Sequence, residues 1–191
     1  MMPNTEKILL DEFNDINDNP DLDLPYTISY WDPPGEENIF NWKVLFIGPE
    51  GTAYDGGFFR AKITFEKDYP KSPPSLYFKT KIFNCNINES NGRVCISIIN
   101  DWKINDKEDK KYIEPERKNI KEVLFAASIL FYDQNPDDAY NSKAAELYKK
   151  EDKTEFNNKV KEYIDLYATE EKYDKEELQN WETRRLKLFN I

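Results

Sequence analysis

Between residues 25 and 79 the chain alternates short runs of β-branched and aromatic residues with clusters of turn-forming residues, and this alternation most constrains the fold. The connections hold proline and glycine, as in Gly48-Pro49 and Pro73-Pro74, the latter a candidate for a cis bond. The predicted strands are residues 26–31, 40–47, 58–65 and 76–79. Four strands with short connections predict an antiparallel meander.

Helical periodicity flanks the predicted sheet on both sides. Residues 4–17 place apolar side chains at helical spacing among acidic ones, with Asn4 or Thr5 as the candidate cap. Further helices are predicted at 119–131, 142–149 and 154–167, with a fourth candidate in 170–189. Residues 80–117 carry no long periodic segment, and such stretches are usually functional or disordered. An N-terminal helix, a four-stranded meander and three to four helices make an α+β fold.

A chain of 191 residues is long enough for one domain with a substantial core, and too short for two. We predict a core domain over residues 1–168 and a charged helical extension over 169–191. The extension either packs back on the domain or docks a partner through its apolar residues. These are Leu178, Trp181, Leu186, Leu188 and Phe189.

The net charge of −10 argues against nucleic-acid binding and favours basic protein partners. No secretion signal or apolar run of membrane-spanning length is evident, so we expect a cytoplasmic or nuclear protein with no membrane attachment. In a reducing compartment both thiols, Cys85 and Cys95, are expected to be free. Two cysteines and no histidine make a zinc site a poor interpretation, and we expect no metal or cofactor.

Cys95 lies in the run Gly92-Arg93-Val94-Cys95-Ile96 of a chain that contains no histidine. A cysteine nucleophile normally needs an adjacent base unless its substrate arrives activated or its own pKa is low. A thiol that only accepts an activated acyl group and passes it on does not need an adjacent base. The alternative is a small buried apolar residue, which is the common role of a free cysteine.

Several short motifs agree in order and spacing with one known family. They are Gly48-Pro49-x-Gly51-Thr52-x-Tyr54-x-Gly56-Gly57-x-Phe59, Tyr69-Pro70-x-x-Pro73-Pro74, Asn86-Ile87, Gly92-x-Val94-Cys95-Ile96-x-Ile98, Asn135-Pro136-Asp137-Asp138 and Ala144-Ala145-x-x-Tyr148. From about Glu6 to Tyr167 the chain resembles the ubiquitin-conjugating enzymes, and among them the members with an insertion beside the active site.

The resemblance implies roles for four residues. Cys95 matches the cysteine that accepts ubiquitin as a thioester from an activating enzyme and passes it to a substrate lysine or a ligase. Asn86 matches the asparagine that stabilises the oxyanion of the tetrahedral intermediate. Asp138 matches the acidic residue that orients and deprotonates the attacking lysine, and Tyr140 the neighbouring wall of the site. The implied partners are ubiquitin or a ubiquitin-like protein, the activating enzyme, ligases and protein substrates.

Alternatives stay open at this stage. The family's His-Pro-Asn motif reads Asn84-Cys85-Asn86 here, which keeps a non-catalytic ubiquitin-binding variant of the fold in view. Conjugation of a ubiquitin-like modifier is a further alternative. The Asn86 side chain is also suited to satisfying local backbone groups, and Asp138 to capping the next helix.

Overall fold

The computed structural model describes residues 5–18, 26–30, 37–102 and 119–173, together with Lys175, Glu176, Leu178, Gln179 and Thr183. Residues 103–118, which include most of the C-terminal part of the stretch predicted to be irregular, and most of the segment beyond Tyr173 therefore lie outside the described residues. No helix in the described ranges has both the length and the apolar character needed to cross a membrane.

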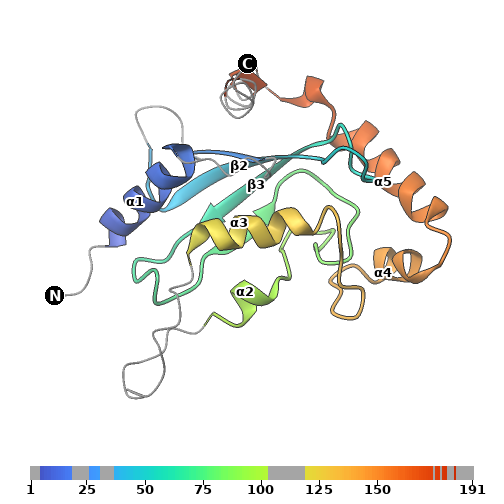
Figure 1. Ribbon diagram of the computed structural model, residues 1–191, viewed down its shortest axis with the longest axis horizontal. Helices are drawn as coiled ribbons and strands as arrows, with labels where there is room; N and C mark the ends of the chain where they lie inside the picture. The colour runs from blue at the N-terminus through green and yellow to red at the C-terminus, as the bar shows by residue number, and fades with distance from the viewer. Residues whose placement is uncertain are drawn as a thin grey trace.

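A four-stranded antiparallel sheet forms the centre of the molecule, in the order β1-β2-β3-β4, so the predicted meander is confirmed (Figure 1). The bounds differ from the predictions by one residue or so. The strands are β1 (Tyr26–Tyr30), β2 (Asn41–Ile47), β3 (Phe58–Thr64) and β4 (Ser75–Phe78). Alternate residues of β2 and β3 point into the core, as the period of two requires.

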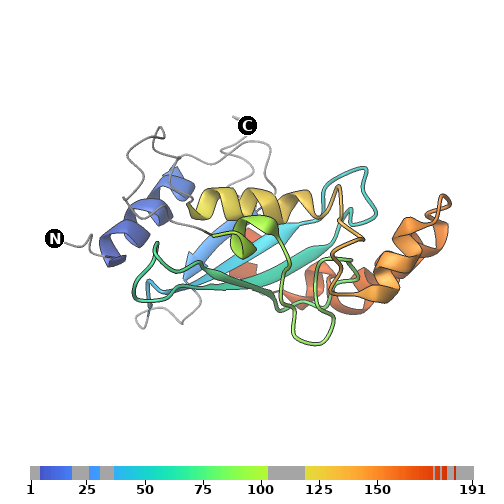
Figure 2. The same cartoon turned by 90° about the horizontal axis from the view of Figure 1, so that it is seen from below.

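Helices precede and follow the sheet, which confirms the α+β class. They are α1 (Thr5–Asp18), α2 (Ser97–Asn100), α3 (Ile120–Ile129), α4 (Ser142–Lys149), α5 (Thr154–Tyr167) and the 3₁₀ turn η1 (Glu170–Lys172). The short helix α2 falls in the stretch predicted to be irregular. Helix α3 crosses one face of the sheet and buries Val123, Leu124 and Ala127 against it (Figures 1 and 2).

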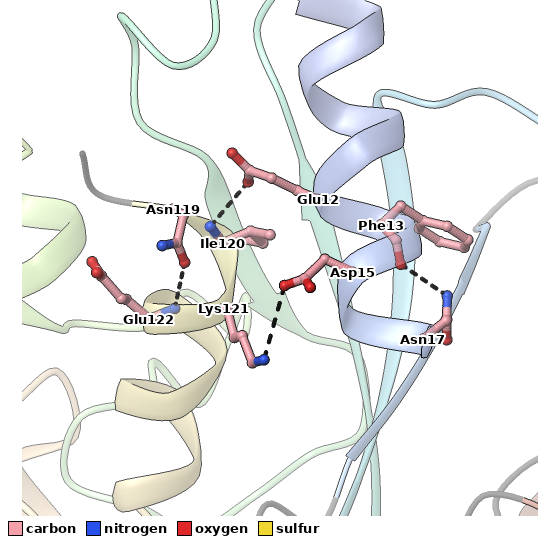
Figure 3. Close-up of polar contacts among 8 residues, drawn as sticks. All are labelled: Glu12, Phe13, Asp15, Asn17, Asn119, Ile120, Lys121 and Glu122. Atoms are coloured by element: carbon pink, nitrogen blue, oxygen red, sulfur yellow. Dashed lines mark hydrogen bonds and ion pairs between the residues drawn. The ribbon is translucent and has the colours of Figure 1, made fainter. Parts of the chain in front are cut away.

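Polar contacts fix α1 against the N-terminus of α3 (Figure 3). The carboxylate of Glu12 accepts a hydrogen bond from the backbone N–H of Ile120 at 3.1 Å. An anion at this position satisfies a helix N–H that has no partner within the helix. Lys121 lies 3.9 Å from Asp15, and Asn119 caps α3 by accepting from the N–H of Glu122. The contacts of Glu12 and Asp15 with α3 join elements more than 100 residues apart.

Among the described residues a cis peptide bond occurs at Tyr69–Pro70 and none at Pro73–Pro74, so the expectation of a cis bond at Pro73–Pro74 is wrong. Tyr69 is buried beside this bond, and its hydroxyl donates to Glu12 at 2.7 Å. Most X–Pro bonds in folded proteins are trans, so a Pro-Pro pair alone is weak evidence for a cis bond.

Candidate active site

The segment that carries Cys95 is held against the end of the sheet by backbone hydrogen bonds. The N–H of Val94 donates to Leu76 in β4, and the N–H of Cys95 donates to the carbonyl of Asn86 at 2.8 Å. Gly92 permits this approach, because its φ is +75° and a Cβ would meet the carbonyl oxygen of Phe78 at 1.8 Å. The segment therefore presents Cys95 at a fixed position, immediately before α2.

The side chains of Asp138 and Asn100 both contact the sulfur of Cys95. The thiol donates to Oδ2 of Asp138, with an Sγ to oxygen distance of 3.4 Å. Nδ2 of Asn100, the last residue of α2, donates to the same sulfur at 3.4 Å. Cys95 is 6% exposed, whereas Asp138 and Asn100 are both exposed. The sulfur is thus enclosed but lies next to groups that an incoming molecule can reach.

The surroundings of Cys95 change the pKa of its thiol in opposing ways. Burial is the main cause, and it raises the pKa above the ordinary value because it disfavours the thiolate. The hydrogen bond from Asn100 lowers the pKa, the carboxylate of Asp138 raises it, and the side chain of Tyr140 lowers it. The net effect is upward, so Cys95 is held as a thiol rather than as a free thiolate.

Of the four residues predicted for the site, three meet at the sulfur and one does not. Asp138 and Tyr140, which the resemblance assigned to the site, both lie beside the sulfur of Cys95. Asp138 does not cap the next helix, because Asn141 does so by accepting from the N–H of Ala144. Within the described residues the Asn86 side chain is directed at the backbone of residues 135–138 and not at the sulfur.

The side chain of Asn86 connects two loops. Its amide donates to the carbonyls of Asn135 and Asp138, at 2.8 and 3.1 Å, and its oxygen accepts from the N–H of Asn135 at 2.8 Å. The Asn86 side chain therefore satisfies backbone groups, as the alternative to a catalytic role predicted. These groups are distant in the sequence rather than local. These three bonds hold the loop on which Asp138 stands.

The residues Asn84 and Cys85 form the base of this arrangement. Asn84 is fully buried; its amide donates to the Leu130 carbonyl and the Tyr54 hydroxyl, and its oxygen accepts from the N–H of Asn86. Gln134 accepts from the N–H of Cys85 and donates to Tyr54. The Asn84-Cys85-Asn86 turn is thus fixed by a satisfied buried polar network.

Both cysteines are free, and they differ in environment. Cys85 is completely buried, and burial raises its pKa to about 11. Its backbone carbonyl accepts from the N–H of Tyr140, but among the described hydrogen bonds its thiol makes none to Cys95, Asn100 or Asp138, which fits the incidental role expected for it. Among the described residues, no cluster of three or more cysteine or acidic side chains is arranged to hold a metal ion.

Sequence reasoning missed Asn100. Its position was a usable signal, because one helical turn brings Asn100, four residues after Ile96, back beside the segment that carries Cys95, and its N–H donates to the carbonyl of Ile96. This relation was not predicted because α2 has only four residues, and so short a helix leaves no periodic pattern in the sequence.

The fold and the site together define the class of the protein. It is an α+β domain with an enclosed cysteine whose sulfur contacts an amide and a carboxylate. The family model for the ubiquitin-conjugating enzyme matches residues 9–164. The chain therefore belongs to the ubiquitin-conjugating enzyme family, whose members are transferases.

Individual relatives agree with this assignment. Ubiquitin-conjugating enzyme E2 of African swine fever virus is 33% identical over 75% of this chain and 62% of its own length. Ubiquitin-conjugating enzyme E2 S of Aquarana catesbeiana is 39% identical over 60% of this chain and 48% of its own. Ubiquitin-conjugating enzyme E2 S-B of Xenopus laevis is 35% identical over 71% of this chain and 58% of its own length. The chain thus spans about half to three fifths of these curated relatives.

A solved structure also matches. It is a Toxoplasma gondii ubiquitin conjugating enzyme E2 domain, with a TM-score of 0.68 and 25% sequence identity. The similarity covers 86% of this chain and 99% of that domain.

Proposed function

We propose that the chain accepts ubiquitin from an activating enzyme as a thioester on Cys95 and transfers it to a substrate lysine or to a ligase cysteine. The observation that carries this proposal is the placement of the Cys95 sulfur between the Asp138 carboxylate and the Asn100 amide, each 3.4 Å away. The first group accepts a proton and the second stabilises negative charge. Acyl transfer through sulfur needs both.

Loading exchanges one thioester for another. The sulfur of Cys95 attacks the thioester carbonyl on the activating enzyme, a new sulfur–carbon bond forms, and the bond to the other sulfur breaks. The proton of Cys95 leaves to the Asp138 carboxylate or to solvent, and the departing thiolate takes up a proton in turn. The two thioesters have similar bond energies, so no strong base such as histidine is required.

Transfer to lysine makes different demands. The amine has an ordinary pKa of about 10.4, so a neighbouring carboxylate has to orient it and take a proton. The exposure of Asp138 and its contact with the sulfur support this role for it. As the nitrogen–carbon bond forms, the carbonyl oxygen becomes negative, and the sulfur–carbon bond then breaks to release Cys95.

Two amides are candidates for stabilising that oxygen. Oxyanion stabilisation by Asn86 remains the prediction made from the family motif. Both amide hydrogens of Asn86 are directed at backbone carbonyls, so this role requires one of those bonds to be exchanged. We add Asn100 as a donor, because its amide already reaches the atom to which the acyl carbon would be attached.

The test is a loading assay with activating enzyme, ATP and ubiquitin. We expect an adduct that reductant removes, and that Cys95→Ser abolishes or converts into a reductant-stable ester. Cys85→Ala is the matched control and should load normally, since Cys85 is fully buried. Repeating the assay with a panel of ubiquitin-like proteins in place of ubiquitin identifies which modifier is loaded. If no modifier forms an adduct, the enzymatic proposal is wrong and the non-catalytic binding variant is favoured.

A further inference from the structure

The sheet has a second face, opposite α3, which we call the outer face. The buried residues of β2, β3 and β4 belong to the core shared with α3, so strand alternation directs the residues between them to the outer face. Lys43 pairs with Lys62, Lys62 with Tyr77, and Tyr77 with Arg93. Because cross-strand partners share a face, these four residues form a row across the sheet, and three of them are cations.

The row ends beside Cys95. Arg93 and Cys95 belong to the segment that lies along the open edge of β4. Val94 between them is buried in the core, so alternation places Arg93 and Cys95 on the same side of this segment. Two residues of extended chain span about 6.6 Å, so the exposed Arg93 side chain stands next to any molecule that approaches the thiol.

Tyr77 connects Arg93 to a second cation. The Nζ of Lys79 lies 5.9 Å from the centroid of the Tyr77 ring, within the range of a cation–π contact. Lys79 and Arg93 are both exposed, and neither takes part in an ion pair in the part of the chain that the structure describes. In a chain of net charge −10, two such cations beside the candidate active site favour an acidic ligand.

A cavity of about 230 Å³ lies next to this pair, between the segments 78–82 and 87–92. Lys79 and Lys81 line it, together with one acidic residue, Glu89. The Glu89 carboxylate accepts a hydrogen bond from a tyrosine hydroxyl of α5, so it is directed away toward that helix. The charged residues of the lining are therefore two cations and one engaged anion, which again suits an acidic side chain.

We propose that Arg93 and Lys79 select acceptor proteins in which acidic residues flank the attacking lysine. The inference rests on the proposed function, because it concerns the protein whose lysine reacts with the Cys95 thioester. An acceptor that presents its lysine to Cys95 and Asp138 has to lay its neighbouring residues on the surface around the sulfur. Extended chain advances about 3.3 Å per residue, so residues one to three positions from the lysine come within reach of the two cations.

The chemistry of the two cations defines the preferred acceptor. The Arg93 guanidinium binds a carboxylate through two parallel N–H donors, which gives the contact direction as well as charge. A basic residue at the same place on the acceptor meets like charge. Both cations are exposed, so the outcome is a preference in rate rather than an absolute requirement, and added salt weakens it.

Discharge of the loaded thioester to short synthetic peptides tests this preference. Each peptide contains one lysine, flanked by glutamate, glutamine or arginine. At low salt we expect the glutamate peptide to react on the order of fivefold faster than the glutamine peptide, and the arginine peptide to react slowest. Arg93→Glu should reverse the order of the glutamate and arginine peptides. Lys161→Glu is the matched control, because this exposed lysine of α5 changes the net charge equally, and it should keep the wild-type order.

The comparison uses ratios of rates within one variant, so a general change in thioester reactivity cancels. Free lysine serves as the reference acceptor. Equal rates with the three peptides, in a wild-type chain that loads a modifier and discharges it to free lysine, overturn this inference and leave the proposed function standing. An unchanged order of peptides in Arg93→Glu overturns it as well.

Peptide binding to the unloaded chain examines the same surface without any transfer, and it decides the matter if no modifier is loaded. Fluorescence anisotropy at low salt should show tighter binding of the glutamate peptide than of the glutamine peptide. Arg93→Glu should remove the difference, and Lys161→Glu should preserve it. Failure of loading together with selective binding overturns the proposed function but not the acidic preference of this surface. Equal binding of the two peptides to a chain that does not load overturns both.

Discussion

At the scale of single residues, burial has the largest effect on the Cys95 thiol and raises its pKa, while two neighbours act in opposite directions. The Asn100 amide stabilises the thiolate, and the Asp138 carboxylate opposes it. A raised pKa protects the thiol from unwanted oxidation and alkylation at neutral pH. It also makes the approach of an activated acyl group, rather than spontaneous ionisation, the event that starts the chemistry.

The pH dependence of Cys95 alkylation should reveal these opposing effects. The rate rises with pH as the thiolate forms, and the midpoint lies above that of an ordinary cysteine because the pKa is raised. Asn100→Ala removes a contact that lowers the pKa, so its midpoint should move to higher pH. Asp138→Asn removes a charge that raises the pKa, so its midpoint should move to lower pH. Iodoacetamide labelling followed by peptide mass spectrometry measures both.

Cys85 is the internal control of that experiment. It is fully buried with a pKa of about 11, so it should stay unlabelled throughout the neutral range. Midpoints that move in the same direction in both variants contradict the assignment of opposing contacts.

At the scale of elements, the loop with Asp138 has its geometry because the Asn84-Cys85-Asn86 turn holds it. The carbonyl of Cys85 accepts from the N–H groups of Tyr140 and Asn141, and the Asn86 side chain bonds to residues 135 and 138. The turn itself rests on Tyr54, Gln134 and Leu130 through Asn84. The departure from the family's His-Pro-Asn motif therefore leaves the turn fully hydrogen-bonded.

A double-mutant cycle separates the two roles considered for Asn86. If it acts by positioning Asp138, Asn86→Ala and Asp138→Ala should each slow discharge of the thioester to free lysine, on the order of a hundredfold. The double variant should then be no slower than either single one. Loading should be nearly unchanged in all three. Effects that multiply in the double variant identify Asn86 as an independent donor to the oxyanion.

At the scale of the whole molecule, aromatic packing connects the sheet to the helices that carry the site. The ring of Phe131, just after α3, lies 5.3 Å from the rings of both Tyr54 and Phe59, 5.8 Å from Phe46 and 6.2 Å from Phe78. These contacts fix the chain after α3, from which Gln134 and Asp138 follow directly.

Phe131→Ala should therefore cost much of the stability of the domain. We expect the free energy of unfolding to fall by about 3–5 kcal/mol, because the substitution leaves a cavity among four rings. Urea denaturation followed by circular dichroism measures it. Tyr132→Ala is the matched control, since Tyr132 is 54% exposed, and its effect should stay within about 0.5 kcal/mol. Equal losses in the two variants would contradict this placement of the core.

The sequence by itself determined the elements and their order. Strand alternation and helical spacing are local patterns, so the meander and helices α4 and α5 could be predicted nearly to the residue. The motifs around Cys95 and Asp138 could likewise be assigned, because their order along the chain carries the resemblance.

Only the tertiary structure decided where the amides point. Asn84 bonds to Leu130, 46 positions away, and Asn86 to Asn135, 49 positions away, and these partners meet only when α3 docks on the sheet. The same applies to Leu45, which strand alternation places on the face opposite Val44 and Phe46 and which is nevertheless only 3% exposed. The physical reason is one of range: periodicity reports on neighbours within a turn or a strand, whereas hydrogen-bond partners and burial depend on packing between distant segments.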